Sequence, residues 1–346
     1  SKVNTLTIKS NSIAVVTDGS AILGLGNLGP EAALPVMEGK AMLFKEFADI
    51  DAWPICLATQ DVEEIIETVK NIAPVFGGIN LEDISAPRCF EIEARLKEIL
   101  NIPVMHDDQH GTAVVLLAAL KNALKIVKKD IKDIRVTVSG VGAAGAASCR
   151  ILLAAGARHL LACNRKGVVL VVDDENLDQA QGDLFSCVDA NAPRMTLREA
   201  LIGADVFIGV SAGNILSAGD LKRMKDDRIV FAMANPDPEV NPHEALKICR
   251  VFATGRSDFP NQINNALAFP GIFRGALNVR AKEINEEMKL AASDALADLV
   301  AEEQLSEEYI IPGIFDKRVV AAVAAAVQEA AYKTKVARKG SFSDGR

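Results

Sequence analysis

Short apolar runs alternate with amphipathic helical stretches along most of this chain, and this alternation most constrains its fold. IAVVTDGS and AILGLGNLG predict short strands broken by glycine turns, and EAALPVMEGKAMLFKEFA predicts a helix. WPICLAT, PVFGGINLEDIS and IPVMH predict further strands, separated by the helical stretches DVEEIIETVKNIA and FEIEARLKEIL. Strands that alternate with helices form βα units, so the sequence predicts an α/β domain with a mainly parallel sheet.

A second α/β unit follows a long helical stretch, GTAVVLLAALKNALKIVKK. Later strands are predicted at HLLACN, DVFIGVS, RIVFAMANP and RVFATG, each apolar enough to be buried on both faces. We expect a substrate- and metal-binding α/β domain at residues 1–106, completed by helices at 265–334. We expect a Rossmann-type doubly wound parallel sheet at 107–264 and a flexible tail at 335–346. A chain of 346 residues is long enough for two domains.

Charge and composition exclude some classes of partner. A net charge of −8 argues against general binding to nucleic acid or to an anionic membrane, because both need a basic surface. No uncharged apolar run reaches the length of about 18 residues that spans a bilayer, and the first residues do not resemble an export signal. The cysteines are far apart with no C-x-x-C pair, which predicts free thiols in a reducing, cytoplasmic compartment. They are Cys56, Cys89, Cys149, Cys163, Cys187 and Cys249.

A glycine-rich turn lies between the predicted strand IRVTVS and a small-residue helix. Gly140, Gly142 and Gly145 form G-x-G-x-x-G, with Ala143 and Ala144 between the last two glycines. In a dinucleotide site the first glycine allows a tight turn, the second admits the pyrophosphate and the third packs helix on strand. The alternative is a glycine-rich packing turn, but the strand before it and the helix after it favour a cofactor.

The choice between NAD and NADP depends on the end of the next strand. About 20 residues past the glycines, an acidic residue would hold the ribose hydroxyl of NAD. This chain has Asn164, Arg165 and Lys166 there. The cations slightly favour the 2′-phosphate of NADP, and a solvated turn is the alternative.

Two acidic pairs each follow a predicted strand. Glu82-Asp83 follows PVFGGINL and Asp107-Asp108 follows IPVMH. Strands of an α/β sheet present ligand-binding groups at this end, and converging carboxylates suit Mg²⁺ or Mn²⁺. A single acidic pair is more often solvated or a helix cap, so only the two together predict a metal site. His106 and His110 flank the second pair, but because the segment spans a strand end we discount a zinc site.

Lys40 lies inside the apolar helical stretch MEGKAMLFK. Its ammonium group either reaches out to solvent or is desolvated for proton transfer, and the residue alone favours the first reading.

Several of these segments, in order, resemble motifs of the malic enzyme family. They are VVTDGSAILGLGNLG, PVMEGKAMLFK, NLEDISAPRCFEIE, VMHDDQHGTA, SGVGAAGAA, FAMANPDPE and NNALAFPGIFRGAL, and the resemblance runs from about residue 13 to about residue 331. It implies oxidative decarboxylation of (S)-malate to pyruvate and CO₂, with reduction of NAD or NADP and dependence on Mg²⁺ or Mn²⁺. It also implies a homodimer or a dimer of dimers.

The resemblance further implies roles for individual residues. Lys40 resembles the general base for the malate hydroxyl, with Asp107 beside it, which overrides the solvent-reaching reading. Glu82, Asp83 and Asp108 resemble the carboxylates that bind the metal. Asn235 and Asn265 resemble asparagines that contact substrate or nicotinamide.

The family also has a tyrosine acid in an upstream segment that this sequence does not contain, and Tyr309 and Tyr332 match nothing in that motif. Either an N-terminal portion lies outside this sequence or the chain is a naturally short homologue, and we expect weakened turnover. Two other functions stay open: a malolactic enzyme that makes lactate, and a catalytically impaired core that binds dinucleotide and metal.

Overall fold

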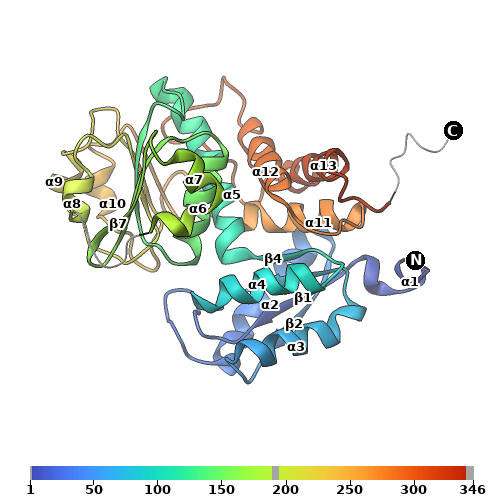
Figure 1. The fold of residues 1–346 in the computed structure, drawn as a ribbon. Helices are drawn as coiled ribbons and strands as arrows, with labels where there is room; N and C mark the ends of the chain where they lie inside the picture. The colour runs from blue at the N-terminus through green and yellow to red at the C-terminus, as the bar shows by residue number, and fades with distance from the viewer. Residues whose placement is uncertain (1, 189–194, 340–346) are drawn as a thin grey trace. The chain divides into compact units, whose positions relative to one another are not determined.

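The chain forms two compact units, which a computed structural model describes over residues 2–188 and 195–339 (Figure 1). The first unit comprises Ser1–Gly111, Asn265–Leu296 and Ile314–Arg346, and the second comprises Thr112–Asn264 and Ala297–Gly313. The expected divisions, after residues 106 and 264, lie close to the first two of these boundaries. The segment 297–313 differs, because we expected it in the first domain and it groups with the second unit.

Side-chain amides of the second unit explain the placement of segment 297–313. Asn122 Nδ2 donates to the carbonyl oxygens of Ala297 and Ile310, at 2.9 Å each. Asn261 Nδ2 donates to the carbonyl of Glu307 at 2.7 Å, and its Oδ1 accepts from Ile310 N at 3.0 Å. Asn122 and Asn261 are both buried, so these hydrogen bonds satisfy polar groups that would otherwise be costly to bury.

The first unit is built on a four-stranded parallel sheet in the order β2-β1-β3-β4. Its elements are α1 (Val3–Leu6), η1 (Ile8–Ser10), β1 (Ser12–Thr17), α2 (Pro30–Ala48), β2 (Asp51–Cys56), α3 (Val62–Ile72), η2 (Ala73–Val75), β3 (Gly78–Leu81), α4 (Arg88–Ile99), β4 (Val104–His106), η4 (Asn265–Leu267), α11 (Phe269–Asn278) and α13 (Arg318–Lys333). From β1 the chain moves to β2 at one edge of the sheet, and it then crosses back past β1 to β3 and β4 on the other side. With right-handed crossovers, α2 then covers one face and α3 and α4 cover the other, and a switch point lies between β1 and β3.

Aromatic and small residues join the late helices to the first sheet. The Phe44 ring on α2 lies 4.6 Å from the Phe269 ring and 5.5 Å from the Phe273 ring on α11, between ring centroids. A Cβ added at Gly271 on α11 would lie 2.7 Å from Val323 Cβ on α13, so the glycine allows the two helices to approach closely. The expected return of residues beyond 264 to the first domain is therefore seen for α11 and α13.

AILGLGNLG does not form the predicted strand. Gly24, Gly26 and Gly29 have φ of 73°, 83° and 85°, in the left-handed region that interrupts an extended strand. The segment forms turns, with one isolated bridge between Ile22 and Gly26.

The second unit contains a six-stranded sheet in the order β10-β9-β8-β5-β6-β7. Its elements are β5 (Arg135–Ser139), α6 (Ala143–Ala154), β6 (His159–Asn164), β7 (Gly167–Val172), α7 (Leu177–Gly182), η3 (Leu184–Cys187), α8 (Leu197–Ala200), β8 (Val206–Gly209), α9 (Ala218–Leu221), β9 (Ile229–Ala232), α10 (Pro242–Ala245) and β10 (Val251–Thr254). Five strands are parallel, and the chain runs outward from β5 in both directions, as a doubly wound sheet requires. The predicted fold class is confirmed. The sequence reading missed β7, which pairs antiparallel with β6.

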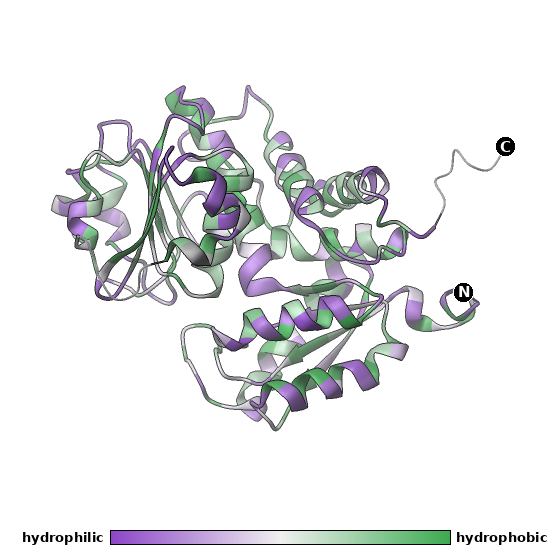
Figure 2. Cartoon of the chain, in the orientation of Figure 1, coloured by the Kyte–Doolittle hydropathy of each residue, from purple (hydrophilic) through white to green (hydrophobic). Residues whose placement is uncertain are grey.

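Two helices, α5 (Asp107–Val127) and α12 (Glu286–Asp298), cross the boundary between the units. Among the described residues, α5 is long and apolar enough to span a bilayer by length and composition, but 72% of that window is buried inside the protein. Figure 2 shows the green, hydrophobic colouring of the strands, against the alternating purple and green of α3 and α4. Buried core helices pass the same test, so α5 carries no membrane assignment.

Part of the expected tail is anchored. Arg338 N and Lys339 N both donate to the carbonyl of Val279 at 3.0 Å, and Lys282 N donates to the carbonyl of Val336 at 2.9 Å. The expectation of a free tail therefore fails for 335–339, because backbone groups of 279–282 are available to pair with it. Residues 340–346 of that expected tail lie outside the described residues.

Candidate active site

Polar side chains of the first unit gather where its central strands end. Asp18 follows β1, Glu82 and Asp83 follow β3, and Asp107 and Asp108 follow β4 as the first residues of α5. β1 and β3 flank the switch point, where open α/β sheets bind their ligands. The two acidic pairs predicted from the sequence therefore lie together at one end of the sheet.

Lys40 projects from the buried face of α2 into this group. That face is formed by Ala33, Met37, Lys40, Phe44 and Ala48. Lys40 is 7% exposed; its Nζ lies 2.9 Å from Glu82 Oε1, contacts Asp107 Oδ2, and lies 4.0 Å from the centre of the Phe269 ring. The ammonium group does not reach solvent, so the reading that the residue alone favoured is wrong.

Three carboxylates form a cluster beside Lys40. One oxygen each from Glu82, Asp83 and Asp108 lies within 4.8 Å of the others. Asp83 has φ of 52°, and its backbone N–H donates to Asp108 Oδ2 at 2.8 Å. Asp83 Oδ2 is buried without a hydrogen-bond partner among the described residues. A buried carboxylate oxygen left unpaired is costly, and a cation would satisfy it.

Crowding and burial shift the pKa values of these acids upward. Burial, together with the charges of Asp108 and Glu82, raises the pKa of Asp83 to about 8. Burial is also the main cause that raises the pKa of Glu82, Asp107 and Asp108. Burial alone would lower the pKa of Lys40, but the carboxylates of Asp107 and Glu82 outweigh it and raise that pKa. The site thus concentrates more negative charge than Lys40 alone neutralises.

Gly111 and Asn265 fix the carboxylate of Asp107. Asn265 Nδ2 donates to Asp107 Oδ2 at 2.6 Å. A Cβ added at Gly111, one helical turn after Asp107, would lie 2.8 Å from Asp107 Cγ and 3.2 Å from Asn265 Cβ. The absence of a side chain at Gly111 therefore makes room for the Asp107 carboxylate against its own helix.

A buried charged network, which the sequence analysis missed, lies behind the acidic pair. Glu93 of α4 accepts hydrogen bonds from the backbone of His106 at 3.0 Å and contacts His110 Nε2 at 2.9 Å. Lys289 Nζ lies 3.2 Å from His110 Nδ1 and pairs with Glu286. His110 is occupied by this network, and the carboxylate cluster is formed by Glu82, Asp83 and Asp108.

The β1 end carries a second missed group. Asp18 Oδ1 accepts from Ser20 N at 2.9 Å and from Ser20 Oγ at 2.5 Å, while its Oδ2 pairs with Arg88 Nη2 at 3.0 Å. Asn80 Nδ2 donates to Glu82 Oε2 at 2.9 Å and orients that carboxylate. An acidic residue directly after an apolar strand was the sequence signal that identified Glu82. The same signal is present at Asp18 and could have identified it.

The predicted glycine turn of the second unit has the geometry of a dinucleotide fingerprint. Gly140 has φ of 109°, and a Cβ there would lie 2.7 Å from the carbonyl oxygen of Val210. Gly142, which precedes Ala143 and Ala144 at the start of α6, has nothing within 4 Å of an added Cβ, so space is open there. A Cβ at Gly145 would lie 2.7 Å from the carbonyl carbon of Gly140. The first glycine permits the turn, the second leaves room and the third packs closely.

Other predicted residues of the second unit lie at strand ends. Asn164 ends β6, and its Oδ1 accepts from Lys166 N at 2.8 Å; Arg165 and Lys166 are exposed in the turn to β7. Asn235 follows β9 and is exposed. Buried Glu239, missed in the sequence, accepts backbone hydrogen bonds from Ser211 at 2.9 Å and Ala234 at 3.1 Å, and so ties the loops after β8 and β9 together.

Two family models match the chain along most of its length. The model described as malic enzyme, N-terminal domain, matches residues 1–97, and that described as malic enzyme, NAD binding domain, matches residues 109–332. The chain belongs to the malic enzyme family. The resemblance inferred from the motifs is thereby confirmed, as is the expectation of an enzyme that decarboxylates malate oxidatively with a nicotinamide cofactor.

Characterised malic enzymes align with nearly all of this chain. The NAD-dependent malic enzyme of Geobacillus stearothermophilus is 61% identical, over 99% of this chain and 72% of its own length. The bifunctional malic/malolactic enzyme of Bacillus subtilis (strain 168) is 54% identical, over 97% of this chain and 82% of its own. The NADP-dependent malic enzyme of Rhizobium meliloti is 47% identical, over 96% of this chain and 46% of its own.

Solved malic enzyme structures share the fold. The enzyme of Pyrococcus horikoshii Ot3 has a TM-score of 0.89 and 48% identity, and the alignment covers 99% of this chain and 81% of that one. The NAD-dependent enzyme of Thermotoga maritima has a TM-score of 0.87 and 48% identity, covering 94% and 86%.

Proposed function

We propose that this malic enzyme uses Lys40 as the base for the malate 2-hydroxyl and a divalent cation held by Glu82, Asp83 and Asp108. One observation carries the proposal: the buried Nζ of Lys40 contacts Glu82 and Asp107 at the edge of a three-carboxylate cluster. A base must lie within hydrogen-bond reach of the proton that it removes, and Nζ lies next to the carboxylates proposed to hold the cation.

The donor set fits Mg²⁺ or Mn²⁺. All three proposed ligands offer carboxylate oxygens, which these cations prefer, and Asp83 Oδ2 is buried without a partner among the described residues. When bound there, the cation would polarise the oxygens of the substrate and offset the negative charge around Lys40.

The neighbouring side chains hold the base in place. Asp107 and Glu82 form ion pairs with Lys40 Nζ, and the Phe269 ring packs against the same group. Asn265 restrains the Asp107 carboxylate and, on this proposal, directs its amide toward a substrate carboxylate. To receive the hydroxyl proton as the hydride leaves C2, Nζ must first be the neutral amine: a cation bound at the cluster would lower the pKa of Lys40, and the Asp107 carboxylate in contact with Nζ would take up its proton.

The second unit supplies the cofactor site on this proposal. Gly140, Gly142 and Gly145, with Ala143 and Ala144, would cradle the pyrophosphate at the start of α6, where backbone N–H groups point outward. Asn235 would contact the nicotinamide or the substrate. When bound, the nicotinamide accepts the hydride.

We propose that both NAD and NADP are accepted. Asn164 and Arg165 take the place of an acid that would repel a 2′-phosphate, which leaves room for NADP. Relatives divide in the same way: the one that is 61% identical is named NAD-dependent, and one that is 47% identical is named NADP-dependent.

The primary experiment measures formation of the reduced nicotinamide with malate and Mn²⁺, with product analysis, for wild type and Lys40→Ala. We expect pyruvate and reduced cofactor from wild type, and a fall in kcat of at least about 100-fold for the variant at saturating Mn²⁺, which the three carboxylates still bind. Unchanged kcat in Lys40→Ala would remove Lys40 from the mechanism.

Lactate formation is a second candidate function, because a relative that is 54% identical is named a bifunctional malic/malolactic enzyme. Product analysis separates the two: lactate without net reduced cofactor supports the malolactic reaction.

We also propose that the enzyme is a homodimer, or a dimer of dimers, in the cytoplasm. On α2 the side chains of Leu34, Val36 and Met42 are exposed, and Trp53 is exposed on the neighbouring edge strand β2. An exposed apolar patch beside an unpaired sheet edge is typical of an interface. Light scattering should give two or four times the chain mass for wild type and a smaller assembly for Met42→Glu; the single-chain mass for wild type would contradict the proposal. The six free cysteines favour a reducing compartment.

A further inference from the structure

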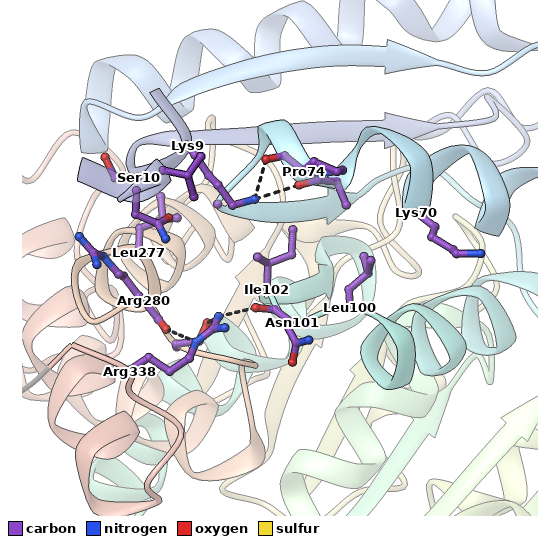
Figure 3. A pocket seen from close by; sticks show the side chains of 15 residues that line it. Lys9, Ser10, Lys70, Pro74, Leu100, Asn101, Ile102, Leu277, Arg280 and Arg338 are labelled. Atoms are coloured by element: carbon purple, nitrogen blue, oxygen red, sulfur yellow. Dashed lines mark hydrogen bonds between the residues drawn. The ribbon is translucent and has the colours of Figure 1, made fainter. Parts of the chain in front are cut away.

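A cavity of about 420 Å³ lies in the first unit at the opposite end of the sheet from the candidate active site (Figure 3). It is lined by residues that precede strands: Lys9 and Ser10 before β1, Gly77 before β3, and Asn101 and Ile102 before β4. The acidic cluster lies where the same strands end. A ligand in this cavity would therefore occupy a site separate from that of malate.

The lining is basic. Lys9, Lys70, Arg280 and Arg338 line the cavity, and no lining residue is acidic. This is unusual in a chain with a net charge of −8. Lys70 pairs with Glu67 on its own helix, but the other three form no recorded ion pair with a carboxylate among residues 2–188 and 195–339.

Carbonyl groups hold two of these cations in place. Lys9 Nζ donates to the carbonyls of Ala73, Pro74 and Phe76. Arg338 Nε donates to the carbonyl of Arg280, and its Nη2 to those of Ala281 and Asn101. These bonds orient the positive groups but bring no full negative charge. Burial and the nearby charge of Arg338 lower the pKa of Lys9, so the positive charge there is incompletely compensated.

Hydrogen bonds to backbone carbonyls give Lys9 and Arg338 a structural role, but such a role does not explain Arg280. The recorded hydrogen bond of the Arg280 guanidinium is a long one, 3.5 Å from Nη2 to Thr5 Oγ1. Arg338 Nη1 has no hydrogen-bond partner in the described part of the chain. Two guanidinium groups therefore keep donors for a ligand, and Lys9 adds fixed positive charge.

We propose that this cavity binds a small oxyanion that carries two negative charges, a phosphate group or a dicarboxylate. Its volume is in the range of small-ligand sites, roughly 300–1,000 Å³. Arginine donors suit the paired oxygens of both groups. The apolar side chains of Leu100, Ile102 and Leu277 leave room for a short carbon body beside the charge.

The test is calorimetric titration of the full chain, at low ionic strength, with inorganic phosphate and separately with succinate. The variant is Arg280→Gln. The matched control is Lys282→Gln, which removes one positive charge from an exposed side chain nearby that does not line the cavity. Each titration is repeated with Mn²⁺ and malate present.

We expect saturable binding to wild type, with an affinity that falls at least tenfold in Arg280→Gln and less than twofold in Lys282→Gln. Binding should also weaken as the salt concentration is raised. The preferred probe identifies the anion as phosphate or dicarboxylate. Absence of saturable binding for both probes, or equal binding by Arg280→Gln and wild type, would overturn the proposal; in the second case, displacement by malate with Mn²⁺ in both proteins alike would place the anion at the active site. If Arg280→Gln does not fold, Lys70→Gln tests the same cavity. An anion affinity that is unchanged in Lys70→Gln and independent of salt would contradict the proposal.

Discussion

Replacing Gly111 by alanine tests how tightly the site constrains Asp107. A Cβ at this position overlaps the Asp107 carboxylate and lies 3.2 Å from Asn265 Cβ. Alanine stabilises a helix by about 1 kcal/mol relative to glycine. If Asp107 moves away, it loses its bonds to Lys40 and Asn265, each worth about 1.5–3 kcal/mol as hydrogen bonds to a charged group. The steric effect wins, and we expect a net loss of about 2–5 kcal/mol in the free energy of unfolding.

The same displacement should lower activity more than metal binding. Misplacing a catalytic group by about 1 Å costs on the order of 100-fold in rate, so we expect kcat to fall by about that factor. Mn²⁺ affinity should change less than about threefold, because Asp107 is not a proposed ligand.

Gly39→Ala is the matched control for Gly111→Ala. Gly39 lies on α2 next to Lys40, and an added Cβ there has nothing within 4 Å. This variant should keep wild-type kcat and gain up to about 1 kcal/mol in urea denaturation. Equal kcat for Gly111→Ala and Gly39→Ala would show that the Asp107 position does not matter.

Three further predictions concern other parts of the chain. Glu93→Ala should destabilise the protein by about 2–6 kcal/mol in urea denaturation, because it leaves two buried groups unpaired, His110 Nε2 and the backbone N–H of His106; a loss below about 1 kcal/mol would contradict the network. Asp205 is buried and pairs with Lys129 and Lys225, whose hydrogen bonds, against the opposing effect of burial, keep its pKa below the ordinary value. The ionised Asp205 carboxylate therefore stabilises the fold above about pH 3.9, and this stabilisation is lost as pH falls through the lower pKa of the folded state. Asp205→Asn should be less stable than wild type by a constant amount from pH 5 to 7, and the difference should shrink below pH 4. Arg165→Gln should lower kcat/KM for NADP about tenfold and leave the value for NAD within twofold; equal effects on both cofactors would exclude contact with the 2′-phosphate.

The sequence predicted the two acidic pairs from their place directly after apolar strands, although it missed Asp18 in the same position after β1. Glu82, Asp83, Asp107 and Asp108 lie directly after apolar strands, and the carboxyl ends of parallel strands meet at one edge of a sheet. The glycine turn was predictable for the same reason, because its conformational demands can be read from residue type alone. Both patterns are local in sequence, and the parallel sheet then brings the acidic residues together at one edge.

Contacts between distant segments could not be predicted in this way. Lys40 has the same apolar helical surroundings whether its ammonium group turns outward or inward, and only the positions of Glu82 and Asp107, 42 and 67 residues away, decide the outcome. The network of Glu93, His110 and Lys289 joins three segments with no shared motif. The placement of segment 297–313 depends on two asparagine amides far away in the sequence.

The crowded carboxylates suggest how stability and function oppose each other in this site. A carboxyl group whose pKa is raised by burial and like charge destabilises the folded chain when it is ionised, and the pKa of Asp83 rises to about 8. A protein selected for stability alone would replace such a group, as functional sites commonly show. Positive charge from Lys40 offsets part of this cost, and the cation proposed at the cluster would offset more. The base and the proposed metal ligands therefore depend on one another electrostatically, so a variant that removes either should change the behaviour of both.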